Sequence, residues 1–378
     1  MTPLGEFPQA MPQEDRIVLS LRQLYEGYGF RHFKMSKFEE YGLYLQNKNF
    51  LASESLITFN DTRGRVLALK PDVTLSIVKN SHASARQSEK YYYIEHVYRV
   101  SPRTREFQEI PQVGLELMGG LPAYTTLEAV ALAARTMERV SPGYLLEISH
   151  MGLVKTLLEA AGCPEEERPR LIRCLRQKNL HGLMQEGQAL GLSPEGCRDL
   201  CRLGEIRGEF AQALEECRPF CRWEGAQKAV AELESLYEGL RAAGLDREVR
   251  LDFAIVNDLD YYNGVIFQGF VEGIPRAVLS GGRYDNLMKK FGHEAGAIGF
   301  ALYLGELERF GRPRREVDVD RLVLCDPKED AAALFAAVDA LVEKGLSVRV
   351  EESVPPGLRA GKICRFDGKT IREVEDHA

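Results

Sequence analysis

The 378-residue sequence predicts an α+β protein, in which an antiparallel sheet is flanked by helices. Three observations lead to this prediction. Short β-like runs with turn residues between them fill the first third of the chain and return after residue 248, a 3.6-residue period dominates residues 163–246, and a β–α–β pattern lies near the end. Strand runs interrupted by helices, with hairpins between them, are typical of an α+β domain on an antiparallel sheet.

The first predicted element is an amphipathic helix over residues 12–28. Its apolar residues recur at spacings of three and four, and Gly29 follows as a stop signal. Five β-like runs come next, separated by turn residues such as Asn60-Asp61: residues 31–35, 56–60, 66–70, 91–99 and 114–118. A helix over 125–140 and a strand over 144–149 complete this part of the prediction.

The character of the chain changes between residues 163 and 246, which are rich in Glu, Arg, Leu and Ala and read as a helical insertion. Extended segments are predicted over 249–255, 261–272 and 277–279, and a helix over 297–310. After the break at Gly311-Arg312-Pro313, residues 321–350 form a β–α–β pattern, and a hairpin over 362–373 turns at Asp367-Gly368. We therefore expect a main domain, 1–312, that contains the insertion, and a small C-terminal α/β domain, 313–378.

Composition excludes several classes of protein. A content of 44% hydrophobic and 28% charged residues is that of an ordinary globular protein, not a disordered or fibrous one. The net charge of −7 argues against a molecule built to wrap a polyanion. The sequence has no targeting segment at its start and no run of about 18 apolar residues, and no cysteine among its first 160 residues. We expect a cytoplasmic protein that binds neither membrane nor nucleic acid.

Four segments are dense in polar, aromatic and glycine residues: 69–74, 98–116, 257–264 and 280–285. Their two carboxylates, Asp72 and Glu116, together with a Gln, a Thr and Tyr hydroxyls, can form a small polar pocket for a cationic ligand. Each residue alone is more simply a turn carboxylate or a half-buried strand Tyr. Their joint occurrence in this order indicates a site.

In this order, the four segments resemble those of the histidyl-tRNA synthetase catalytic domain, a class II aminoacyl-tRNA synthetase fold. Residues 259–264 resemble the family's histidine-binding signature and residues 281–285 its partner motif, and the resemblance covers about residues 9–310. It implies a histidine pocket, in which Asp72 stands where Glu is usual. The predicted pocket residues are Asp72, Thr74, Arg99, Gln112, Glu116, Tyr261, Tyr262 and Tyr284.

The sequence departs from the family where ATP would bind. The resemblance implies arginines at two positions that here are Asn257 and Glu306. Glu308-Arg309 could restore the second arginine only through a three-residue slip along the helix, which still leaves Arg309 one turn further on. The second motif has Val100-Ser101-Pro102 where a Glu is expected, and Ser36 replaces the first motif's proline. Amino-acid activation needs positive charge against the phosphates, so this pattern predicts that aminoacylation has been lost.

Only about sixty residues follow Pro313, nearer half of an ordinary domain than the full anticodon-binding domain of a synthetase. These features are similar to those of a narrower family, the regulatory subunit of ATP phosphoribosyltransferase. That resemblance implies a non-catalytic chain that forms a homodimer, assembles with a short catalytic subunit for the first step of histidine biosynthesis, and takes part in feedback inhibition by L-histidine. It implies no cofactor. We favour the synthetase-like pocket for the effector, and a subunit interface is the alternative.

Two rival interpretations remain open at this point: an active or truncated histidyl-tRNA synthetase, and a stand-alone histidine sensor or tRNA-binding module. A metal site is a separate question. Two Cys-x3-Cys pairs, at 197/201 and 217/221, could supply four thiolates for a tetrahedral zinc site. The spacing of i, i+4 favours instead cysteines that are buried as small hydrophobic residues on helices. The seven His show no ligand spacing, so no catalytic metal is expected.

Overall fold

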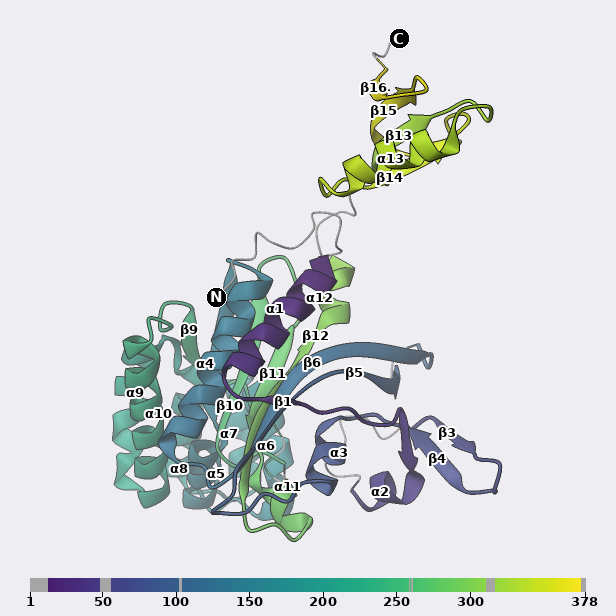
Figure 1. Ribbon diagram of the computed structural model, residues 1–378. Helices are drawn as coiled ribbons and strands as arrows, with labels where there is room; N and C mark the ends of the chain where they lie inside the picture. Colours follow the sequence, from purple (N-terminus) through teal and green to yellow (C-terminus); the bar gives the residue numbers. More distant parts are fainter. Residues whose placement is uncertain are drawn as a thin grey trace. The chain divides into compact units, whose positions relative to one another are not determined.

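The computed structural model describes residues 13–47, 56–101, 104–257, 259, 261–310 and 317–374. These residues form two compact units: residues 18–310, and residues 13–17 together with 317–374. The main unit is built on a sheet of nine described strands (Figure 1). In chain order they are β1 (Arg31–His32), β5 (Glu89–Val100), β6 (Phe107–Gly119), β7 (Tyr144–His150), β8 (Arg207–Glu209), β9 (Val249–Asp252), β10 (Val265–Val271), β11 (Leu279–Arg283) and β12 (Gly296–Tyr303).

The strands lie in the order β1-β5-β6-β12-β11-β10-β7-β9-β8. All neighbours are antiparallel except β1 with β5 and β7 with β9, which are parallel. The predicted α+β class, with a mainly antiparallel sheet flanked by helices, is therefore confirmed. The β5–β6 hairpin joins segments of the second sequence motif, and β6 pairs with β12 at the centre.

The period of two along each strand divides the side chains between two faces of the sheet. One face packs against helices α1 (Gln13–Gly27) and α4 (Ala123–Val140), which Figure 1 shows lying across it. Tyr25 of α1 meets the ring of Phe300 at 6.3 Å between centroids and hydrogen-bonds Thr136 of α4 at 2.9 Å. The opposite face carries the polar residues of the sequence motifs, such as Glu116. The predicted helices over 12–28 and 125–140 are confirmed within one or two residues.

One predicted element is wrong. Residues 297–310 were expected to form a single helix, but 296–303 are strand β12 and only α12 (Leu304–Phe310) is helical. β12 is bordered by β6 on one side and β11 on the other, and its apolar residues are buried. A strand buried on both faces reads as a continuous apolar run, which periodicity alone does not distinguish from a buried helix.

A smaller sheet lies beside the polar face in the order β2-β4-β3: β2 (Phe38–Glu40), β3 (Thr58–Asn60) and β4 (Val66–Leu69). Helices α2 (Tyr41–Gln46) and α3 (Thr74–Lys79) accompany it, and neither was predicted. The apolar side chains of α3 are fully buried with those of α11 (Asp285–Lys290), in one cluster with Tyr93 and Tyr284. The start of α3 thereby faces the polar side of the large sheet.

The segment 163–246 contains the predicted helices: α6 (Arg168–Arg176), α7 (Leu180–Ala189), α8 (Pro194–Glu205), α9 (Phe210–Cys217) and α10 (Glu224–Ala242), with 3-10 turns at Glu165–Glu167 and Arg218–Arg222. It also contains strand β8, which the periodicity did not indicate and which pairs with β9 at the sheet edge. Helix α10 packs against α4 and against α5 (Met151–Ala160), which follows β7.

The second unit has its own four-stranded sheet, in the order β14-β13-β15-β16. β13 (Val319–Leu324) and β14 (Val348–Glu351) are parallel and joined through α13 (Ala331–Val342), as the β–α–β pattern predicts. β15 (Ala360–Phe366) and β16 (Ile371–Glu373) form the predicted hairpin, with Gly368 at a φ of +88° in its turn. Within the described residues, no helix is long and apolar enough to cross a membrane.

Candidate ligand pocket

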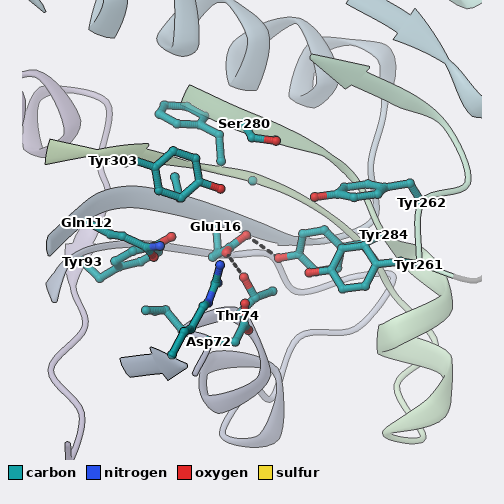
Figure 2. A pocket seen from close by; sticks show the side chains of 16 residues that line it. Asp72, Thr74, Tyr93, Gln112, Glu116, Tyr261, Tyr262, Ser280, Tyr284 and Tyr303 are labelled. Carbon is teal, nitrogen blue, oxygen red and sulfur yellow. Dashed lines mark hydrogen bonds between the residues drawn. The ribbon is translucent and has the colours of Figure 1, made fainter. Parts of the chain in front are cut away.

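The polar face of the large sheet contains a cavity of about 70 Å³ (Figure 2). All eight residues predicted from the sequence line it: Asp72, Thr74, Arg99, Gln112, Glu116, Tyr261, Tyr262 and Tyr284. They come from the start of α3, from β5 and β6, from the segment before β10, and from the end of β11. Asp258 and Asp260 of the third motif lie outside the described residues. The small volume and the polar lining suit a small polar molecule.

Glu116 lies at the centre of the cavity and is only 2% exposed. Its Oε1 accepts a hydrogen bond of 2.7 Å from Thr74, and its Oε2 accepts one from the hydroxyl of Tyr284 (Figure 2). Burial raises the pKa of Glu116 to about 8, the two hydrogen bonds oppose this rise, and the nearby Asp72 carboxylate adds to it. Near neutral pH the Glu116 carboxyl is therefore mostly protonated, until a cation enters beside it.

The room around Glu116 depends on glycines in neighbouring strands. A Cβ on Gly299, the residue paired with Glu116, would lie 1.7 Å from Oε2 of Glu116 and 2.4 Å from a backbone oxygen. A Cβ on Gly114 would lie 2.4 Å from the hydroxyl of Tyr93. These distances are far inside van der Waals contact, so any side chain at either position displaces part of the pocket wall.

Two further charged residues, Asp72 and Arg99, line the cavity beside α3. Oδ1 of Asp72 accepts a hydrogen bond from the backbone N–H of Leu75 at 2.9 Å, and Nε of Arg99 donates to the carbonyl of Pro71 at 2.9 Å. Burial raises the pKa of Asp72, and Arg99 acts against that rise. The cavity thus offers one guanidinium and two carboxyl groups to a ligand.

Lys70 fixes the turn before α3, which carries Asp72, against strand β5. It is fully buried, its Nζ lies 2.5 Å from Oε2 of Glu95, and its carbonyl accepts a hydrogen bond from the N–H of Tyr98. The turn that carries Asp72 is therefore tied to strand β5 through both side chain and backbone.

The tyrosines form the remaining wall. The rings of Tyr261 and Tyr262 meet edge to face at 4.5 Å between centroids, and Tyr261 lies 5.8 Å from Tyr284. The hydroxyl of Tyr262 points toward the cavity in Figure 2. Burial raises the pKa of all three, so each stays a neutral hydroxyl able to donate or accept a hydrogen bond.

The sequence analysis did not predict three polar side chains that line the cavity: Tyr93, Ser280 and Tyr303. Tyr93 pairs with Gly114 across β5 and β6, so strand alternation from Glu116 could have indicated it. Tyr303 was hidden because its strand was predicted as helix. Ser280 lies within the fourth motif but was not singled out.

The departures from the synthetase pattern lie elsewhere. Asn257 does not line the small cavity but a larger one on the same sheet. Glu306 lies in the first turn of α12, where Oε1 is 3.6 Å from Nη1 of Arg276. The side chains of Glu308 and Arg309 lie outside the described part of the chain, and Ser36 accepts a hydrogen bond from the N–H of Phe38.

The two Cys-x3-Cys pairs lie in the helical segment 163–246. Cys197 and Cys201 lie on α8, but Cys217 ends α9 and Cys221 belongs to the following 3-10 turn, so the second pair does not share one α-helix. The eight cysteines carry free thiols. Among the described side chains, no three His, Cys, Asp or Glu groups lie close enough together to hold a metal ion.

Comparisons with known proteins give the family of the chain. A family model described as histidyl-tRNA synthetase matches residues 7–307. The chain is 33% identical over 301 residues to an ATP phosphoribosyltransferase regulatory subunit from Moorella thermoacetica, which covers 78% of this chain and 76% of that protein.

The chain is also similar to solved structures. The crystal structure of an ATP phosphoribosyltransferase regulatory subunit/histidyl-tRNA synthetase from Bacillus halodurans has a TM-score of 0.74 and 27% identity, covering 93% of this chain and 92% of that one. An ATP phosphoribosyl transferase (HisG:HisZ) complex from Thermotoga maritima contains a chain with a TM-score of 0.61 at 18% identity, covering 78% and 98%. The second likeness concerns the fold alone.

Proposed function

The chain belongs to the family of ATP phosphoribosyltransferase regulatory subunits, which has the histidyl-tRNA synthetase fold, and we propose that it acts as the non-catalytic, histidine-sensing subunit of such an enzyme. Its partner is a short catalytic subunit that joins ATP to phosphoribosyl pyrophosphate in the first step of histidine biosynthesis. The chain forms a homodimer within the hetero-oligomer and works in the cytoplasm.

The observation that supports histidine sensing is the small cavity around Glu116. Its lining matches the groups of a histidine zwitterion: one guanidinium, Arg99, for the carboxylate, and two carboxyls, Asp72 and Glu116, for the ammonium and the imidazole. Tyrosine hydroxyls and the Gln112 amide supply the neutral hydrogen bonds that orient a polar ring. A cationic group beside Glu116 restores its ionised form and repays part of the cost of burying it.

A non-catalytic role is supported by the two positions where a synthetase would hold ATP with arginine. Asn257 has no charge, and Glu306 brings a carboxylate, partly balanced by Arg276 at 3.6 Å. Activation of an amino acid develops negative charge on the phosphates, so these residues do not favour its transition state.

Regulation requires that histidine bind two states of the assembly with different affinity, typically by a coupling free energy of about 1–3 kcal/mol. Phosphoribosyltransferase activity is measured with the short catalytic subunit alone, with this chain added, and with this chain plus increasing L-histidine. We expect activity to depend on the chain and to fall with histidine. Activity independent of the chain contradicts the proposal.

The main rival is an active synthetase. Histidine-dependent ATP–pyrophosphate exchange by the purified chain would establish that rival, and we expect none. A matched pair of variants locates the effector: Glu116→Gln in the pocket and Glu238→Gln on the exposed face of α10. Loss of histidine inhibition only in the first variant places the effector in the pocket, whereas unchanged inhibition in both places it at a subunit interface.

A further inference from the structure

A second cavity, of about 420 Å³, opens on the same sheet beside the helical insertion. It is lined by Glu147, Arg176, Lys178, Asp252, Ala254, Ile255, Val256, Asn257 and Gln268, and it shares no residue with the small pocket. Its volume lies in the range of about 300–1,000 Å³ that is usual for small-molecule sites. The small pocket and this cavity lie on neighbouring strands, because Gln268 of β10 pairs with Ser280 of β11.

The insertion supplies the two cations of the cavity from the end of α6. Lys178 follows that helix with a φ of +53°, a left-handed conformation in which glycine is the usual residue. Its Nζ lies 2.8 Å from Oδ2 of Asp252, so the side chain is used to tie the insertion to the end of β9. Arg176 donates from Nε to the carbonyl of Val256 at 3.2 Å, which holds its guanidinium over the cavity.

The sheet supplies the opposite charge. Glu147 of β7 and Gln268 of β10 are directly paired across the two strands and both line the cavity. Glu147 is half-buried, and among the described residues no hydrogen bond or ion pair reaches its carboxylate. Burial and the nearby Asp252 raise the pKa of Glu147, with Lys178 acting against them. The Glu147 carboxylate is therefore free to take a cationic partner from a ligand.

The charges that remain for a ligand are therefore one carboxylate on the sheet side and one guanidinium on the insertion side. Lys178 and Asp252 neutralise each other, so the lining as a whole has no net charge. A wall of buried residues, Ala254 to Val256, completes the cavity. A cavity lined by one available carboxylate and one available guanidinium suits neither a polyanionic ligand nor a ligand with a single positive charge.

We propose that this cavity is a second ligand site, which binds a zwitterion of the amino-acid class, with its ammonium group against Glu147 and Gln268 and its carboxylate against Arg176. The side chain of the ligand lies along the Ala254–Val256 wall. The site is independent of the proposed histidine pocket and does not rest on the function proposed above.

The test uses the full chain and the twenty common L-amino acids, each added in millimolar excess while thermal unfolding is followed. Wild type and Glu116→Gln are compared, because the variant disables the small pocket. We expect at least one amino acid to raise the melting temperature of both proteins, and its N-acetyl and carboxamide derivatives to have no effect. If none of the twenty stabilises both proteins, the proposal is wrong.

Titration calorimetry with the stabilising amino acid then locates the site. Glu147→Gln and Arg176→Gln are each expected to weaken binding by about tenfold or more, since each removes one charge-assisted partner. Arg173→Gln, an exposed residue of the same helix outside the cavity, is the matched control and keeps wild-type affinity. Equal affinity in all three variants overturns the proposal. Far-ultraviolet circular dichroism and unliganded melting temperatures like those of the control variant verify that each variant is folded.

Discussion

The buried carboxyl of Glu116 makes the stability of the protein depend on pH in a way that one substitution removes. Burial raises its pKa from 4.5 to about 8 in the folded chain. Between pH 4.5 and about pH 8, the Glu116 carboxyl has lost its proton in the unfolded chain and keeps it in the folded chain. The free energy of unfolding therefore falls as pH rises through this range, and above about 8 it changes no further from this group.

The magnitude follows from the same shift. At about 1.4 kcal/mol for each tenfold change in proton affinity, a pKa that moves from 4.5 to about 8 corresponds to at most about 5 kcal/mol. Glu116→Gln keeps the shape of the side chain but does not titrate, and its amide replaces one of the two accepting oxygens with an NH2 donor. The expected result is that the variant is the more stable protein at pH 8 by several kcal/mol, and that this advantage disappears near pH 4.5.

Urea unfolding of wild type and Glu116→Gln, followed by far-ultraviolet circular dichroism at half-unit steps of pH, measures the difference directly. Glu238→Gln serves as the control, because it removes an exposed carboxylate from α10. A difference between wild type and Glu116→Gln that stays constant from pH 4.5 to 8 would refute the reasoning. It would mean that Glu116 titrates alike in the folded and unfolded chains.

Three further substitutions test the pocket and its support. Tyr262→Phe removes a hydroxyl from the cavity and is expected to weaken histidine binding by about 1–3 kcal/mol in calorimetry, whereas unchanged affinity moves the ligand elsewhere. Gly299→Ala drives a methyl group into the pocket floor, so it should abolish histidine binding and lower the melting temperature. Its control, Gly42→Ala, meets no atom within 4 Å and should change stability by no more than about 1 kcal/mol. Lys70→Met leaves the Glu95 carboxylate without its counter-charge, so the free energy of unfolding in urea should fall by about 3 kcal/mol or more. A fall of less than about 1 kcal/mol would contradict this role for the ion pair.

Much of the fold was readable from local patterns because its elements are half-buried. Helix α1 and strand β7 each have one side that is more apolar and more buried than the other, so their periods of 3.6 and 2 appear in the sequence. Strand β12 failed this test because both of its faces are covered. Short helices such as α3 were missed because six residues show too little of a period.

The candidate pocket was predicted through motif order, and its additional lining residues were not. Tyr93 and Tyr303 reach the cavity only because β5, β6 and β12 are neighbours in one register. The second cavity had no sequence signal, since Glu147 and Arg176 come from a strand and an insertion helix that no motif connects.

By itself, the sequence determined the fold class, the family and the eight polar residues that gather in one place, because residue type and local spacing carry that information. Tertiary structure alone decided that the Glu116 carboxyl is held neutral, that Gly299 makes room for it, and that a second charged cavity lies beside the insertion. The physical reason is that pKa shifts, close approach and charge pairing depend on distances between residues far apart in the chain, which strand register and helix packing set.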